Sequence, residues 1–118
     1  HAAPVAELLR EYGVSAVAMK GFDLESLKDL IAQDHPVLTW VIGNVEGGVP
    51  HLYTDSQGNQ VTVAAYEHVV IVIGYNDDTD SITYMNNGKY YETPSSVFEN
   101  SWSVLEYMAI YREEKDGP

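Results

Sequence analysis

A histidine and an asparagine, placed at neighbouring ends of two apolar segments, could together carry out acid–base chemistry. His68 opens the segment Glu67–Tyr75, and Asn86 closes the next segment, 81–86, eighteen positions after the histidine. If these segments pair as antiparallel strands, the two ends lie side by side. The carboxamide of Asn86 could then accept the Nδ1–H of the imidazole and hold Nε2 toward a substrate, as in a Cys-His-Asn/Asp site. Spacing alone leaves open the alternative that His68 caps a strand end by bonding to the backbone.

The segments around this pair predict an α+β domain with a mainly antiparallel sheet. Apolar residues at helical spacing indicate helices over 4–12 and 24–31, the second capped by Asp23, and Thr93-Pro94 starts a third. In that third helix, Ser96 and Glu99 have the spacing of a capping box. Segments rich in β-branched and aromatic residues indicate strands over 14–19, 37–43, 51–54, 60–64, 67–75, 81–86, 89–92 and 107–112. Helices come first, strands follow as a meander, and one helix precedes the last strand, which is the order of an α+β fold.

The length and charge of the chain exclude several classes of function. At 118 residues, 1–118 is expected to be a single domain. Eighteen acidic against six basic residues give a formal charge of −12, so nucleic acid and acidic membrane surfaces would be repelled. The longest apolar run, Val69–Ile73, is far shorter than the roughly 20 residues of a membrane span, and we expect no membrane insertion. The acidic excess indicates solubility first and a groove for cationic peptides second.

We expect neither a metal ion nor a cofactor. The histidines show no paired spacing of the kind that zinc sites use, and they are His1, His35, His51 and His68. The acidic turn 76–80 resembles a run of calcium ligands, but it lacks the glycine and the downstream glutamate of an EF-hand loop. A solvated turn is the preferred interpretation.

The order of these features resembles the His half of papain-like cysteine peptidases of the double-glycine-leader type, which are related to bacteriocin-processing enzymes. That family has a His before an apolar strand, then Gly-Tyr-Asp, a turn, a return strand that ends in Asn-Asp-Pro, and a Ser-led helix with a Phe and a Trp. The matching residues here are His68, Gly74-Tyr75-Asn76, Asn86, Ser95 or Ser96, Phe98, Trp102 and, in the last strand, Ala109. Upstream, Leu8–Gly13, Phe22–Leu27 and His35–Leu38 are also similar to segments of that family. The resemblance covers roughly residues 4–112.

The resemblance implies that His68 is the general base and acid of a peptidase site and that Asn86 stands where the family has its orienting Asp. Here Asn86-Asn87 replaces the family's Asp-Pro, which removes a negative charge beside the imidazole. An amide can still fix the tautomer, but it stabilises the imidazolium less. Trp40 has two interpretations, a core residue first and a wall of a substrate groove second.

The chain contains no cysteine, so it is expected to be inactive as a cysteine peptidase on its own. The family's N-terminal segment, with its oxyanion-hole Gln and its Cys at the start of a helix, has no counterpart here. The resemblance therefore implies a papain-like fold without the nucleophile helix, as the C-terminal part of a longer domain. By the family layout the serines of the late helix lie away from His68, and no serine nucleophile is expected; they are Ser95, Ser96, Ser101 and Ser103.

Two functions from different classes follow from this. The first is a peptidase-like domain that carries the His/Asn half of the site and acts on a peptide or protein once a Cys is supplied. The second is a catalytically inactive domain that binds peptides or cell-surface polymers, or that regulates. An absent helix would leave apolar surface bare, which favours a homodimer through the uncovered groove. The family analogy implies an extracellular or cell-surface setting.

Overall fold

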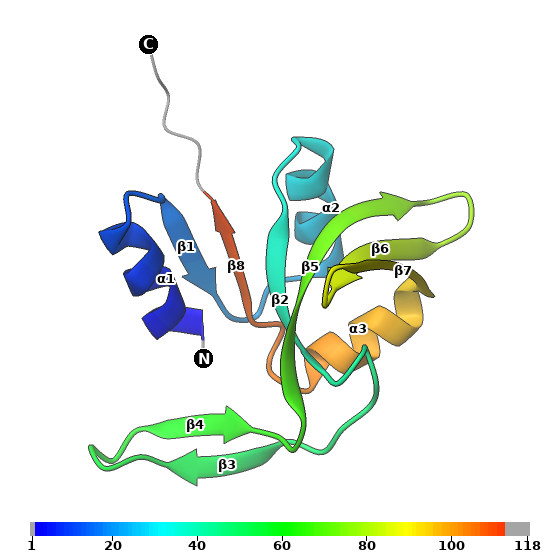
Figure 1. Ribbon diagram of the computed structural model, residues 1–118. Helices are drawn as coiled ribbons and strands as arrows, with labels where there is room; N and C mark the ends of the chain where they lie inside the picture. The colour runs from blue at the N-terminus through cyan, green and yellow to red at the C-terminus, as the bar shows by residue number, and fades with distance from the viewer. Residues whose placement is uncertain (1, 113–118) are drawn as a thin grey trace.

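The computed structural model describes residues 2–112, and its strands form one large sheet with a separate hairpin (Figure 1). The six-stranded sheet has the order β1-β8-β2-β5-β6-β7, and all its neighbouring strands are antiparallel. The α+β class with a mainly antiparallel sheet is confirmed. The strands of the sheet are β1 (Ala16–Met19), β2 (Val37–Ile42), β5 (Glu67–Asn76), β6 (Ser81–Asn86), β7 (Lys89–Pro94) and β8 (Ala109–Arg112). The hairpin comprises β3 (His51–Thr54) and β4 (Gln60–Val63).

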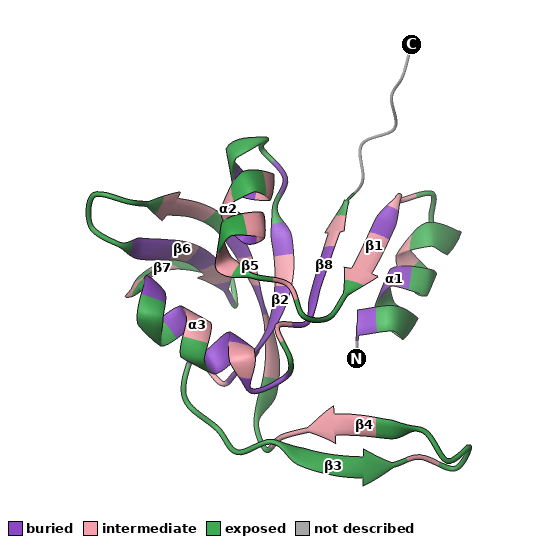
Figure 2. Ribbon diagram, turned by 180° about the vertical axis from the view of Figure 1, so that it is seen from behind, coloured by how far each residue is buried: buried purple, intermediate pink, exposed green. Residues whose placement is uncertain are grey.

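Three helices cover parts of both faces of the sheet: α1 (Ala2–Glu11), α2 (Leu24–Ala32) and α3 (Ser95–Ser103). In Figure 2 the helices α2 and α3 lie in front of the sheet, whereas α1 lies beside β1 and β8 at the opposite end. Within residues 2–112, no helix is long and apolar enough to span a membrane. Homodimerisation stays a prediction, since the structure contains a single chain.

The main core lies between the sheet and the two helices α2 and α3. Its buried members come from both helices and from the central strands, and they include Leu27, Ile31, Val41, Val70, Val72, Ile82, Phe98 and Trp102. A second buried cluster joins α1 to β2 and β8, and it contains Ala6, Trp40, Leu105 and Ile110. Trp40 is therefore a core residue, with 6% of its surface exposed, and the alternative that it walls a substrate groove is wrong.

The pairing of β5 with β6 determines which side chains share a face near His68. Ile71 pairs with Met85 and Val72 with Tyr84, and the register then shifts at Ile73, which forms a bulge before Gly74. Continuing these pairs toward the start of β5 places Asn86 level with Val70, which is two residues from His68 and on the same face. On the other side of β5, His68 stands directly opposite Val41, a residue of the main core. Because opposite residues point to the same side of a sheet, His68 and Asn86 lie on the face that α2 and α3 cover.

The starts of the helices follow the sequence in one case and depart from it in another. Asp23 caps α2 as predicted, since its Oδ1 accepts a hydrogen bond of 2.7 Å from the backbone N–H of Ser26. The capping box predicted for Ser96 and Glu99 is wrong, because α3 begins at Ser95 with Pro94 as its N-cap and without a side-chain cap. Pro94 still pairs with Ser81 in the sheet, so the chain passes directly from strand to helix and Ser96 is already inside α3.

The last strand is also shorter than predicted. We expected it to begin at Tyr107, but β8 starts at Ala109. Glu106 and Tyr107 have φ angles of 61° and 54°, in the left-handed region, and extended backbone is impossible there. The backbone oxygen of Trp102 accepts a hydrogen bond from the N–H of Tyr107, so Glu106 and Tyr107 belong to the turn that follows α3 and not to the start of a strand.

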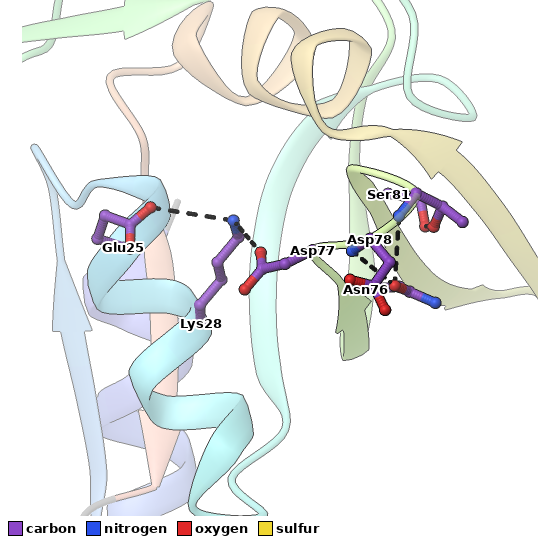
Figure 3. Close-up of polar contacts among 7 residues, drawn as sticks. Glu25, Lys28, Asn76, Asp77, Asp78 and Ser81 are labelled. Atoms are coloured by element: carbon purple, nitrogen blue, oxygen red, sulfur yellow. Dashed lines mark hydrogen bonds and ion pairs between the residues drawn. The ribbon is translucent and has the colours of Figure 1, made fainter.

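The turn between β5 and β6 is held to α2 by one lysine (Figure 3). Lys28 Nζ donates a hydrogen bond of 2.8 Å to Asp77 Oδ1 and lies 3.9 Å from Glu25 Oε1. The Asn76 side chain accepts from the backbone N–H of Asp78, which closes the turn locally. The bond to Asp77 raises the pKa of Lys28 above its ordinary value of 10.5. Between residues 2 and 112 no cluster of His, Cys, Asp and Glu could hold a metal ion. The acidic turn instead binds the ammonium group of Lys28.

Replacing Asp77 by asparagine is expected to lower the free energy of unfolding by about 0.5 kcal/mol, because 68% of the Asp77 side chain is exposed and water screens the pair. Since the folded state raises the pKa of Lys28, the stabilisation is complete below pH 10.5 and is lost as the pH rises through the folded pKa. Urea unfolding at neutral pH measures the change. Asp78→Asn removes a neighbouring charge without this contact and is the control; an equal loss in both variants would contradict the assignment.

Candidate active site

The neighbouring strands β5 and β6 bring His68 and Asn86 into direct contact. His68 Nε2 lies 2.7 Å from Asn86 Oδ1, and the amide oxygen accepts the bond while the ring nitrogen donates it. His68 is half-buried, and Asn86 is only 8% exposed. The predicted contact between imidazole and amide is therefore present. The alternative that His68 caps a strand end through the backbone is wrong, because its partner is a side chain of the next strand.

The nitrogen that makes this contact differs from the one predicted. The sequence predicts Nδ1 on the amide and Nε2 free for a partner, and the structure has the reverse. The reason is the register, in which Asn86 is level with Val70 and thus diagonal to His68. Diagonal neighbours are about 7–8 Å apart, compared with about 5 Å for directly opposite residues, so only the far end of the ring reaches. Nδ1 has no hydrogen-bond partner within residues 2–112.

Two residues that sequence reasoning missed complete the network around Asn86. Asn86 Nδ2 donates to Asn44 Oδ1 at 3.0 Å, and the Tyr84 hydroxyl donates to the same oxygen at 2.9 Å. Tyr84 is two positions before Asn86 on β6, so the period of the strand places both on one face. That spacing was a usable signal for Tyr84. Asn44 follows β2, and only the strand order, with β2 beside β5, could have indicated it.

The hydroxyl of Tyr84 stays protonated far above neutral pH. Tyr84 is 3% exposed, and burial raises the pKa of its hydroxyl, with a smaller contribution from Tyr91. The rings of Tyr84 and Tyr91 are stacked, with centroids 5.4 Å apart. A protonated hydroxyl donates its single proton, and here that proton goes to Asn44.

A shallow groove of about 390 Å³ opens beside the histidine. Its walls come from the turn after β2, the start of β5 and the end of β6, and they comprise Gly43, Asn44, Tyr66, Glu67, His68, Asn86 and Asn87. A larger pocket of about 530 Å³ lies between α1, β1 and β4, and its lining is mainly apolar. Among its described lining residues, only Lys20 and Glu106 are charged, with 3.6 Å between Lys20 Nζ and Glu106 Oε2, and none is a histidine. The groove at His68 is therefore the better candidate for an active site.

The comparisons with known proteins assign the family. A model of the Peptidase_C39 like family matches residues 1–110. The chain belongs to this family. A solved structure described as that of a C39-like peptidase from Bacillus anthracis has the same fold, with a TM-score of 0.83 and 21% sequence identity. The similarity covers 99% of this chain and 60% of that one, so the present chain spans less than two thirds of its length. A search of curated proteins found no match.

The C39-like chain contains no cysteine, and the serines of α3 do not replace one. Ser101 Oγ accepts a 3.0 Å hydrogen bond from the backbone N–H of Ile42, and Ile42 pairs with Glu67 in the sheet. Ser101 is fully buried, however, and no serine of the described chain lines the groove. Ser95 Oγ is also buried, without a hydrogen-bond partner within residues 2–112.

The other two histidines in the described part of this C39-like chain do not line the groove. His35 Nδ1 lies 2.9 Å from the backbone oxygen of Arg112, and His51 is exposed on β3. His1 lies outside the described residues. The three described histidines thus occupy separate places in the fold, and of these three only His68 lines the groove.

Proposed function

We propose that this chain supplies the His/Asn half of a cysteine peptidase site, with His68 as base and acid and Asn86 as its orienting residue. The observation that carries the proposal is the 2.7 Å bond between His68 Nε2 and Asn86 Oδ1, which occupies one ring nitrogen. A proton on Nε2 makes the neutral Nδ1 the basic nitrogen. The nucleophile would come from a cysteine outside this chain, so residues 1–118 would form part of a longer peptidase domain.

The chemistry would be acyl transfer through the free nitrogen. Nδ1 would take the proton of the thiol, and the thiolate would attack the carbonyl carbon of the scissile peptide bond. The resulting imidazolium would return that proton to the leaving amine as the C–N bond breaks, and a water activated by the same nitrogen would release the acyl group. Asn86 would orient the ring throughout. As a neutral amide it would stabilise the imidazolium less than the carboxylate of an aspartate would.

We further propose a peptide with a double-glycine leader as the substrate. The support is the order of His68, the segment 74–76 and Asn86, which is similar to that of the double-glycine-leader peptidases, together with the match to the Peptidase_C39 like family. The groove is open and shallow, which suits an extended peptide better than a small molecule enclosed on all sides.

The test uses the full-length gene product that contains this chain, together with a peptide that carries a double-glycine leader. We expect cleavage after the second glycine, complete loss of cleavage after alkylation of thiols, and no cleavage of a peptide in which alanines replace the two glycines. Mass spectrometry of the products identifies the bond. Peptide binding without cleavage would instead support the second function, an inactive binding domain. A full-length product without any cysteine would contradict the peptidase proposal.

A further inference from the structure

We propose that Asn44 and Tyr84 are positioning residues: they fix the direction of the Asn86 carboxamide and so decide which ring nitrogen of His68 carries the proton. The inference deepens the proposed function and rests on it, since a base role needs one defined nitrogen to be free. Neither residue reaches the imidazole itself; each acts through Asn86.

The direction of the Asn86 amide is set by what faces its two ends. Its oxygen faces His68 and its nitrogen faces Asn44 Oδ1, at 2.7 Å and 3.0 Å respectively. Turning this amide alone would place two oxygens against each other at Asn44 and an N–H₂ group against the imidazole. An oxygen pair at hydrogen-bond distance has no proton to share, so a single reversal is disfavoured.

Reversal of both amides together would restore the hydrogen bond between Asn44 and Asn86. Tyr84 opposes this double reversal. Asn44 would then present its nitrogen to the Tyr84 hydroxyl, and the hydroxyl proton would lose the oxygen that now accepts it at 2.9 Å. Tyr84 is 3% exposed, so water does not readily replace that acceptor. The raised pKa of Tyr84 supports the same direction, because a hydroxyl that stays protonated must donate. A buried donor without an acceptor is costly. Every hydrogen bond from Tyr84 through Asn44 and Asn86 to His68 therefore keeps its present donor and acceptor.

The turn that presents Asn44 is itself held in an uncommon conformation. Gly43 and Val45, on either side of Asn44, have φ angles of 50° and 59°. A β-branched residue is rarely left-handed, and such strain persists only where the surroundings enforce it. Val45 is 6% exposed within the main core, and the N–H of Gly43 donates to the oxygen of Tyr66 at 2.8 Å. Packing and backbone bonds thus fix the place of Asn44, which suits a residue with a positioning role.

The consequence is a defined tautomer of His68. With Asn86 Oδ1 as an acceptor, Nε2 must carry the proton, and neutral Nδ1 is left as the base. The reversed network would demand the other tautomer, with the proton on Nδ1 and no free lone pair for a thiol proton. Asn44 and Tyr84 would therefore hold His68 in the tautomer that can act as a base.

Nitrogen-15 NMR of the 118-residue chain, labelled in histidine and studied at alkaline pH where imidazole is neutral, tests this directly. We expect Nε2–H as the dominant tautomer of His68. Tyr84→Phe should shift the tautomer ratio toward Nδ1–H by about fivefold or more, the size of one hydrogen bond. Asn44→Ala should do the same. Asn44→Asp should keep Nε2–H, because a carboxylate accepts from both donors and offers none. Tyr91→Phe, which removes a hydroxyl from the ring stacked on Tyr84, should change nothing.

The outcomes separate this inference from the proposed function. A wild-type His68 with its proton on Nδ1, or an unchanged ratio in both Tyr84→Phe and Asn44→Ala, would overturn the positioning role. If Tyr84→Phe does not fold, as the dispersion of its amide spectrum would show, the exposed Asn44 still decides through its alanine and aspartate variants. Expected tautomer shifts in this chain, with a full-length product that binds but never cleaves peptides, would uphold the positioning role while the peptidase proposal fails.

Discussion

Replacing His68 by glutamine is expected to lower the thiol-dependent peptidase activity that we propose for the full-length product by roughly 10³- to 10⁴-fold. The glutamine can still contact Asn86, but it has no group that accepts and returns a proton near neutral pH. General acid–base catalysis by a positioned side chain contributes about 10²- to 10⁴-fold, and the loss of thiolate formation adds to it. The measurement is kcat/KM for cleavage of the leader peptide.

His51→Gln is the matched control, because His51 is exposed on the β3–β4 hairpin and does not line the groove at His68. We expect its kcat/KM to equal that of the unmodified protein within twofold. Circular dichroism of both variants shows whether the fold is retained. A His68→Gln variant that keeps more than a tenth of the activity would remove His68 from the chemistry, whatever its contact with Asn86.

The sequence was sufficient to predict the strands that carry the site. The run Val69–Ile73 is continuous and apolar, and the turn 76–80 is polar, so both the strands and their antiparallel pairing followed from local pattern. The same pattern placed His68 and Asn86 at adjacent ends, and the structure has them in contact. The end of a strand can be located from the alternation of its residues and from the turn that follows, and both are local properties of the sequence.

The finer geometry of the site depended on features that no local pattern contains. The bulge at Ile73 and the diagonal offset of Asn86 decide that Nε2 makes the contact, and a register is a property of two strands at once. Asn44 is brought in from a turn 42 positions away from Asn86. Its polarity and its place after Gly43 are typical of any turn, so nothing in the sequence marks it as part of the network.

The wrong prediction of a capping box at the start of α3 has a different physical origin. Ser96 and Glu99 have the right spacing for a capping box, but a cap forms only where the helix begins. Pairing with β6 extends β7 to Pro94, and the N–H of Ser95 donates to the oxygen of Asp80 at 2.8 Å. Tertiary pairing therefore sets the start of the helix at Ser95, which places Ser96 inside α3, where it cannot act as the N-cap of a capping box.

Replacing Trp102 by alanine is expected to lower the free energy of unfolding by about 3–5 kcal/mol, the largest change in stability that we predict. Trp102 is fully buried in the main core, and its ring contacts the rings of Phe22, Phe98 and Tyr107 at centroid distances of 6.2, 5.7 and 5.3 Å. Removing the indole leaves a cavity that these neighbours can fill only in part. Urea unfolding measures the change, and Tyr12→Ala, at a side chain 80% exposed, should alter it by less than about 0.5 kcal/mol.

Most of this loss should come from packing and not from the hydrogen bond of the indole. Trp102 Nε1 donates to the backbone oxygen of Met108 at 3.0 Å, but that oxygen also accepts from the N–H of Trp40, so it keeps a partner in the variant. Trp102→Phe should accordingly restore more than half of the lost stability, since it returns ring volume without the donor. Equal losses in the alanine and phenylalanine variants would show that the bond to Met108 dominates. Because a domain of this size is stable by about 5–15 kcal/mol, the alanine substitution should remove a large share of the total stability. Unfolding of the variant should break the hydrogen bond from Ile42 to Ser101, beside Trp102, in the same transition that removes the groove at His68.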